Sequence, residues 1–260
     1  MMRARQVSTW PVIWTVAASL ALLLLTGFAH GETVAEAEAR YGACMNKVET
    51  NAEAAFDDAV AWEGLGGGHP ARHCALAALV EIGHYAEAAQ GLEKLADEVR
   101  ANVVFKAQLL IQSGHAWIAA DKPVRAAAVA DAALRLVPNT PQIFFLRAHA
   151  LALQGKYWEA ADDFSKVIYA EPDNIDALVM RGAAYRQLEA RDLALKDLNR
   201  ALAIDPDHVE GLLERGIVHR LDGRKTQART DWQRLIARHP DTPAGQAAEQ
   251  NLHGLNSGSE

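Results

Sequence analysis

Residues 141–174 read PQIFFLRAHALALQGKYWEAADDFSKVIYAEPDN, and related 34-residue segments flank this one on both sides. A proline stands at the same place near the end of each copy. A fixed period of this length indicates stacked supersecondary units rather than one globular core. Four consecutive units follow, at 107–140, 141–174, 175–208 and 209–242, and their prolines are Pro138, Pro172, Pro206 and Pro240.

Each recurring column of the unit suits a pair of packed helices. Small residues at unit positions 8 and 20 allow two antiparallel helices to cross closely, and large apolar residues at positions 4 and 24 fill the space beside them. The proline stops the second helix because it lacks an N–H donor and clashes with the preceding turn. Position 20 is alanine in every unit: Ala126, Ala160, Ala194 and Ala228.

These columns resemble those of the tetratricopeptide repeat family, over residues 107–242. The resemblance implies an all-α fold, a right-handed superhelical solenoid of antiparallel helix pairs whose first helices line a concave groove. Residues 32–106 are expected to form divergent hairpins of the same kind, ending in a short insertion. After the repeats we expect a capping helix at 243–255, which closes the last core face, and a disordered tail at 256–260.

Residues 1–31 have the layout of a secretory signal peptide. Arg3 and Arg5 precede an uncharged apolar stretch at 12–25, and small residues favour cleavage after Gly31. We therefore expect a periplasmic or secreted protein that is not inserted in the membrane after cleavage. The alternative is an uncleaved inner-membrane anchor, because the whole apolar segment is close to the length that spans a bilayer.

Composition excludes several classes of function. The formal net charge of the 260 residues is −7, which argues against nucleic acid as a partner because phosphate binding needs a concentrated basic surface. Two cysteines are too few for a multi-disulfide scaffold or a four-cysteine zinc module. The segment 223–226 lacks the glycine before lysine and the preceding strand of a phosphate loop. We expect no catalytic residues and no cofactor.

The two cysteines lie on the first helices of successive N-terminal hairpins. Such helices are neighbours in a stack, and an exported protein favours oxidation, so we predict a disulfide between Cys44 and Cys74. It would close a loop of about 30 residues, worth roughly 3–4 kcal/mol in the chain-entropy model. Two free thiols are the alternative. His69 and His73, beside Cys74, have a spacing that can hold a metal ion, but further ligands are not evident and no metal site is expected.

Two charged columns run through three of the units in register. Arginine recurs at unit position 7 and aspartate at position 23, on the first and second helix respectively. We expect bidentate, partly buried ion pairs between the two helices of each unit, with a charged binding stripe as the alternative. The members of this arginine–aspartate ladder are Arg147, Arg181 and Arg215 with Asp163, Asp197 and Asp231.

The family resemblance also implies which residues face the groove. Unit positions 2, 5, 9, 12 and 13 give a surface with an apolar floor, amide and imidazole groups and two arginines. Such a surface suits an extended peptide or a partner's helix, although an apolar member such as Ile111 could instead pack between units. The partner-binding candidates are Gln108, Ile111, His115, Gln142, Phe145, His149, Arg186, Gln187 and Arg220.

These observations predict a non-enzymatic periplasmic scaffold that binds a peptide segment or helix of an envelope protein. Arg186 and Arg220 would select an acidic segment of that partner. One alternative is a self-assembling structural oligomer, and a less favoured one is a protein that binds a metal or small ligand.

Overall fold

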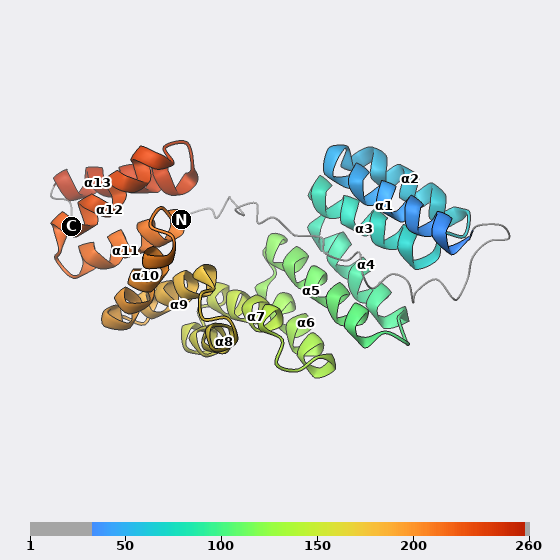
Figure 1. Cartoon of the computed structure of the whole chain (residues 1–260), viewed down its shortest axis with the longest axis horizontal. Helices are drawn as coiled ribbons and strands as arrows, with labels where there is room; N and C mark the ends of the chain where they lie inside the picture. The colour runs from blue at the N-terminus through green and yellow to red at the C-terminus, as the bar shows by residue number, and fades with distance from the viewer. Residues whose placement is uncertain (1–32, 258–260) are drawn as a thin grey trace. The chain divides into compact units, whose positions relative to one another are not determined.

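The computed structural model describes residues 33–257, which form thirteen helices and, within that range, no strand (Figure 1). The all-α prediction is therefore confirmed. The expected signal peptide at 1–31 lies outside the described residues. The chain divides between Leu146 and Arg147 into two compact units, which we describe separately. None of the helices within 33–257 combines the length and apolar character needed to cross a membrane.

The N-terminal unit consists of three helical hairpins and the start of α7. The glycine-rich segment 64–68 lies at the junction of the first two hairpins, and its Gly66 adopts a left-handed backbone with φ of 95°. The helices are α1 (Val34–Thr50), α2 (Ala52–Gly64), α3 (Gly68–Ile82), α4 (Tyr85–Glu98), α5 (Val103–Ala119), α6 (Pro123–Leu136) and α7 (Pro141–Leu153).

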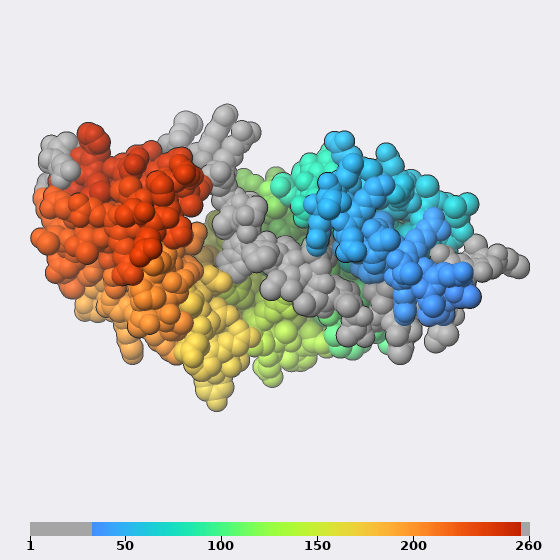
Figure 2. Space-filling view, turned by 45° about the horizontal axis from the view of Figure 1, so that its top comes forward, coloured from blue at the N-terminus to red at the C-terminus, as the bar shows by residue number. Residues whose placement is uncertain are grey.

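The C-terminal unit continues the pairing and ends in a single helix. In the space-filling view its orange-to-red helices form one continuous packed body (Figure 2). The helices are α8 (Tyr157–Ala170), α9 (Ile175–Gln187), α10 (Arg191–Ile204), α11 (Val209–Leu221), α12 (Lys225–Arg238) and α13 (Pro243–Ser257). In α13, Ala248 is buried in a cluster with Trp232 and Leu235 of α12, so α13 covers the apolar face that a further repeat would otherwise cover.

Two boundaries differ from the sequence expectation. The helix α13 continues to Ser257, so residues 256–257 are helical rather than part of a tail. The helix α5 begins at Val103, four residues before the unit at 107–140, and has 17 residues where α7, α9 and α11 have 13. The insertion predicted before this unit therefore forms an additional helical turn.

A column of helix caps lies between the repeats and was not recognised from the sequence. The side chains of Asn174, His208 and Thr242 stand 34 residues apart. Each accepts a hydrogen bond from the backbone N–H three residues further on, at the start of the helix that follows, which is α9, α11 or α13. Such caps satisfy an N–H that has no partner inside the helix, and they fix where each repeat begins.

The turn inside each unit needs a left-handed residue at unit position 15. Gly155 and Gly223 occupy this position in two units, with φ of 75° and 74°. Asp121 and Glu189 occupy the same place in the other two units, with φ of 56° and 58°. A residue with a Cβ atom is disfavoured in this region by roughly 1–2 kcal/mol, so these two turns are less favourable than the glycine turns.

Candidate interaction surfaces and the contacts that position them

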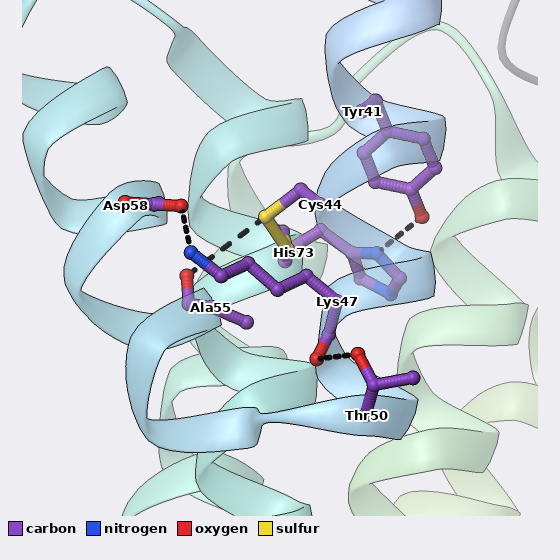
Figure 3. The surroundings of a disulfide bond; sticks show 8 residues. Tyr41, Cys44, Lys47, Thr50, Ala55, Asp58 and His73 are labelled. Carbon is purple, nitrogen blue, oxygen red and sulfur yellow. Dashed lines mark hydrogen bonds and ion pairs between the residues drawn. A yellow bond between two sulfur atoms is a disulfide. The ribbon is translucent and has the colours of Figure 1, made fainter.

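A disulfide joins the first two hairpins of the N-terminal unit. Cys44 of α1 and Cys74 of α3 are bonded, with their Cα atoms 6.3 Å apart (Figure 3). Both side chains are buried in an apolar cluster that includes Val48 and Ala55. The structure thus brings together the two cysteines that the sequence pairs, and it fixes α1 against α3.

A buried polar network lies beside this disulfide. His73 is only 1% exposed and has a polar partner on each side of its ring. The Tyr41 hydroxyl lies 2.7 Å from Nδ1, and the Gln112 Oε1 atom lies 2.7 Å from Nε2 (Figure 3 shows the tyrosine contact). A neutral ring protonated at Nε2 satisfies both, since Tyr41 then donates and Gln112 accepts. Burial lowers the pKa of His73, which favours this neutral form.

The residues considered for a metal site do not converge. Cys74 is in the disulfide, His73 contacts Tyr41 and Gln112, and His69 Nε2 lies 3.6 Å from a carboxylate oxygen of Glu98. Within residues 33–257 no group of three or more His, Cys, Asp or Glu side chains is arranged to hold a metal ion.

The arginine–aspartate ladder forms three bidentate pairs in the C-terminal unit. In each pair Nε and Nη2 of the arginine donate to the two carboxylate oxygens, at 2.6 and 2.9 Å for Arg147–Asp163. The other two pairs have matching distances of 2.6–2.9 Å. The aspartates are buried, and the arginines keep only their outer edge in solvent.

Two ladder arginines also contact the preceding repeat. The Nη1 group of Arg181 donates to Ser165 of α8 at 2.9 Å, and that of Arg215 donates to Asn199 of α10 at 3.0 Å. Burial lowers the pKa of Arg181, but hydrogen bonds and the charge of Asp197 more than offset it, so the net pKa is raised. These charges are neutralised inside the unit, so the ladder has the geometry of a structural element rather than of a binding stripe.

The predicted groove residues of the N-terminal unit differ in their exposure. His115 and Gln142 are exposed, and Phe145 is partly exposed. Gln108 is partly buried, and its Oε1 atom has no hydrogen-bond partner within residues 33–257. Ile111 is 6% exposed and belongs to the apolar core, so its assignment to a binding surface is corrected: it packs between helices.

The predicted groove residues of the C-terminal unit also separate into two kinds. His149 is partly buried, and burial lowers its pKa. Gln187 and Arg220 are exposed. Arg186 on α9 donates from Nε and Nη2 to Glu214 on α11, at 2.6 and 3.2 Å. Both of these side chains are less than a fifth exposed, so Arg186 joins adjacent first helices and is not available to select an acidic partner.

Arg220 occupies the same place on α11 that Arg186 occupies on α9, but it lacks the matching carboxylate. The partner of Arg186, Glu214, comes 28 residues later in the chain. The residue 28 positions after Arg220 is Ala248 of the capping helix, which is buried. Within residues 33–257 Arg220 has no ion-pair partner, and the neighbouring Leu221 is 39% exposed. Arg220 and the residue that follows it, Leu221, are therefore both exposed to solvent.

Comparison with known proteins relates the chain to one family. Two sequence models described as tetratricopeptide repeat match residues 175–208 and 210–242. No curated protein sequence matches the chain.

Solved structures with a similar fold come from repeat proteins. The fragment "MamA 41-end" from Desulfovibrio magneticus RS-1 has a TM-score of 0.59 at 20% identity, covering 67% of this chain and 97% of its own. A tetratricopeptide repeat protein from Parabacteroides merdae has a TM-score of 0.62 at 20% identity, covering 74% and 75%. YrrB, titled "a TPR protein with an unusual peptide-binding site", has a TM-score of 0.54 at 26% identity, covering 67% and 87%. The matched repeats, the helix pairs and these similar folds agree: residues 175–242 are tetratricopeptide repeats, and the chain has the fold of a tetratricopeptide repeat protein.

Proposed function

We propose that the protein is a non-enzymatic scaffold that binds a peptide segment or helix of another protein on its first-helix surface. This surface comprises the exposed and partly exposed side chains of α9 and α11, two helices that pack against each other. The observation that carries the proposal is Arg220, whose charge lacks the carboxylate that its counterpart Arg186 has. The peptide-binding site named for YrrB supports the same kind of activity.

The chemistry of this surface specifies part of the partner. An unpaired guanidinium selects a carboxylate, and it can hold it through two parallel hydrogen bonds. Leu221 beside it offers apolar area to a neighbouring side chain of the same segment. The partner segment therefore carries an acidic residue next to an apolar one. The apolar contact supplies affinity, and the ion pair supplies selectivity.

We further propose that the protein acts in the periplasm, with a partner from the cell envelope. The signal-peptide pattern of residues 1–31 supports this location. The Cys44–Cys74 disulfide supports it independently, because such bonds persist in oxidising compartments. Fractionation of the native cells followed by N-terminal sequencing tests both points. A mature chain that begins at Glu32 in the periplasmic fraction is expected, and an intact N-terminus in the membrane fraction contradicts cleavage.

The binding surface is tested by crosslinked co-purification from the cell envelope with matched arginine variants. The wild-type chain is expected to enrich a protein that Arg220→Gln loses. Arg200→Gln removes the same charge from an exposed side chain of α10, a second helix, and should retain the partner. If Arg220→Gln enriches the same protein as the wild type, the assignment of this surface is wrong even though the scaffold role survives.

A further inference from the structure

Two large aromatic side chains face solvent on the outer side of α8. Trp158 is 62% exposed and Tyr169 is 91% exposed. Together with Asp162, they are spaced four and then seven residues apart, which places all three on one side of an α-helix. Eleven residues of helix separate the two rings by roughly 16 Å along the axis. Among residues 33–257, no other aromatic side chain is as exposed as either of these.

The other repeats of the C-terminal unit show what these positions ordinarily hold. The counterparts of Trp158 are Asp192 on α10 and Thr226 on α12. The counterparts of Tyr169 are Ala203 and Ala237. All four counterparts are exposed, so the outer side of a second helix accepts small or polar residues here. The helix pair therefore does not need aromatic rings at these places, whereas protein interfaces are enriched in tryptophan and tyrosine.

Acidic groups surround the two rings. Glu159, Asp162, Glu171 and Asp173 are exposed on α8 or in the turn that follows it. Two lysines are near these groups: the exposed Lys156 directly precedes α8, and Lys166 contacts both Asp162 and the buried Asp163, at 2.6 and 2.8 Å. Arg200 of α10 reaches Asp173 at 3.6 Å. With Lys156, Lys166 and Arg200 set against the four exposed carboxylates, the outer side of α8 retains an excess of one negative charge.

We propose that this outer α8 surface, defined by Trp158, Asp162, Tyr169 and the flanking carboxylates, docks a basic amphipathic segment of another protein. An arginine or lysine of such a segment can lie over the indole or phenol ring, and its charge is attracted by the carboxylates. Apolar side chains of the segment cover the remaining ring area, which is now in contact with water. The surface is on a second helix, so it is separate from the first-helix surface and goes beyond the function proposed above.

The negative charge also selects among possible occupants. An anionic lipid surface is repelled by the carboxylates, and an acidic peptide likewise. A second copy of this chain is the remaining competitor, because α12 displays Lys225, Arg234 and Arg238. A basic segment of a different protein is the occupant to which the proposal commits, since two of these three residues already contact carboxylates: Arg234 and Arg238 lie 2.7 and 3.9 Å from Asp207.

The test uses the mature chain, residues 32–260, and a fluorescein-labelled 14-residue peptide of alternating leucine and lysine or arginine. A second peptide carries glutamate in place of each basic residue. Fluorescence anisotropy gives the dissociation constants. Trp158→Thr/Tyr169→Ala places on α8 the residues that α12 has at these positions, so the fold is expected to persist. Because this variant changes no charge, the Kd for the basic peptide should rise at least about tenfold only if the rings are contacted.

Two controls separate this surface from others. Leu193→Ala removes an exposed apolar side chain from α10, 45% exposed, and should leave the Kd unchanged. Arg220→Gln alters the first-helix surface and should also leave the Kd for the basic peptide unchanged. A failure of the α8 proposal is therefore distinguishable from a failure of the function proposed for the first-helix surface. Iodide quenching gives a readout without substitutions. Trp62, Trp117 and Trp232 are at most 3% exposed, so the quenchable fluorescence comes from Trp158 and the basic peptide should protect it.

Three results would overturn the proposal. The first is an unchanged Kd for Trp158→Thr/Tyr169→Ala, which would mean that charge alone attracts the peptide. The second is equal binding of the glutamate peptide. The third is a doubled mass of the wild-type chain in light scattering that Trp158→Thr/Tyr169→Ala abolishes, because the occupant would then be a second copy of the protein.

Discussion

Replacing Asp197 by alanine should leave a largely buried arginine without its counterion in the C-terminal unit. The Asp197 side chain is 5% exposed and receives two hydrogen bonds from Arg181, at 2.7 and 2.8 Å. The Arg181 side chain is 17% exposed, so in the variant its guanidinium is largely buried without its counterion. Breaking a fully buried pair by removing one partner costs about 3–5 kcal/mol.

The expected cost for Asp197→Ala is about 2–4 kcal/mol, because water reaches the outer edge of Arg181 and recovers part of the loss. Replacing both partners, as Arg181→Met/Asp197→Leu, should cost less than Asp197→Ala alone, since no unpaired charge remains. The combination of single and double variants should therefore show a coupling energy of at least about 2 kcal/mol.

Urea unfolding followed by circular dichroism measures these free energies. A matched surface control is Asp207→Ala, which removes an exposed contact with Arg234 in the same unit and should be much less destabilising, because solvent screens exposed ion pairs. If Asp197→Ala is no more destabilising than Asp207→Ala, or if the two replacements at the ladder are simply additive, the ladder does not stabilise the repeats and the argument fails.

Three further outcomes follow from the structure. Cys44→Ser/Cys74→Ser should lower the free energy of unfolding of the N-terminal unit by roughly 3–4 kcal/mol, and dithiothreitol should reproduce this in the wild type but not in the variant. Burial lowers the folded-state pKa of His73 below its unfolded value. The neutral ring therefore contributes fully to the free energy of unfolding above about pH 6.5, and this contribution is lost as the pH falls towards the folded-state pKa. The free energy of unfolding in urea should decline between pH 7.5 and 5.5, and His73→Gln should reduce that decline. Glu189→Gly should raise the melting temperature, with a gain of about 0.5–1 kcal/mol in the free energy of unfolding, because glycine adopts the left-handed backbone of this position without steric strain. Gly155→Ala at the same unit position should lower the melting temperature. Equal effects of the two substitutions would contradict the reasoning.

Apart from the Cys44–Cys74 disulfide, most of the structural features predicted from the sequence are ones that repeat. The arginine–aspartate ladder could be predicted because each pair recurs 34 residues later, so a column of cations meets a column of carboxylates on the partner helix. The ends of the second helices could be placed for the same reason, because each lies two residues before the recurring proline. A periodic pattern fixes the register of every unit at once, and local propensity then matters little.

The contacts that occur once could not be predicted in this way. The Arg186–Glu214 pair has no counterpart at the next repeat, where Ala248 stands in place of glutamate, so no column marked it. The network around His73 lies in the divergent hairpins, where no repeated column supplies a register. Ile111 was assigned to a surface from its unit position, but its burial depends on the particular helices packed around it. Trp158 and Tyr169 differ from the small or polar residues at the same unit positions of the later repeats, so the repeat pattern gives no indication of their role.

The additional turn of α5 shows how an array of this kind can change in length. Four residues advance an α-helix by about 400°, one full revolution and about 40° more, and by roughly 6 Å along its axis. Leu92 and Leu95 of the preceding helix therefore still share one buried apolar cluster with Phe105 and Leu109 of α5. An insertion of two residues would turn that flank by about 200° and face it towards water. Insertions and deletions within the helices of this protein should therefore be tolerated when they add or remove close to a whole number of helical turns. The helical pitch thus sets the increments in which the length of a helix can evolve.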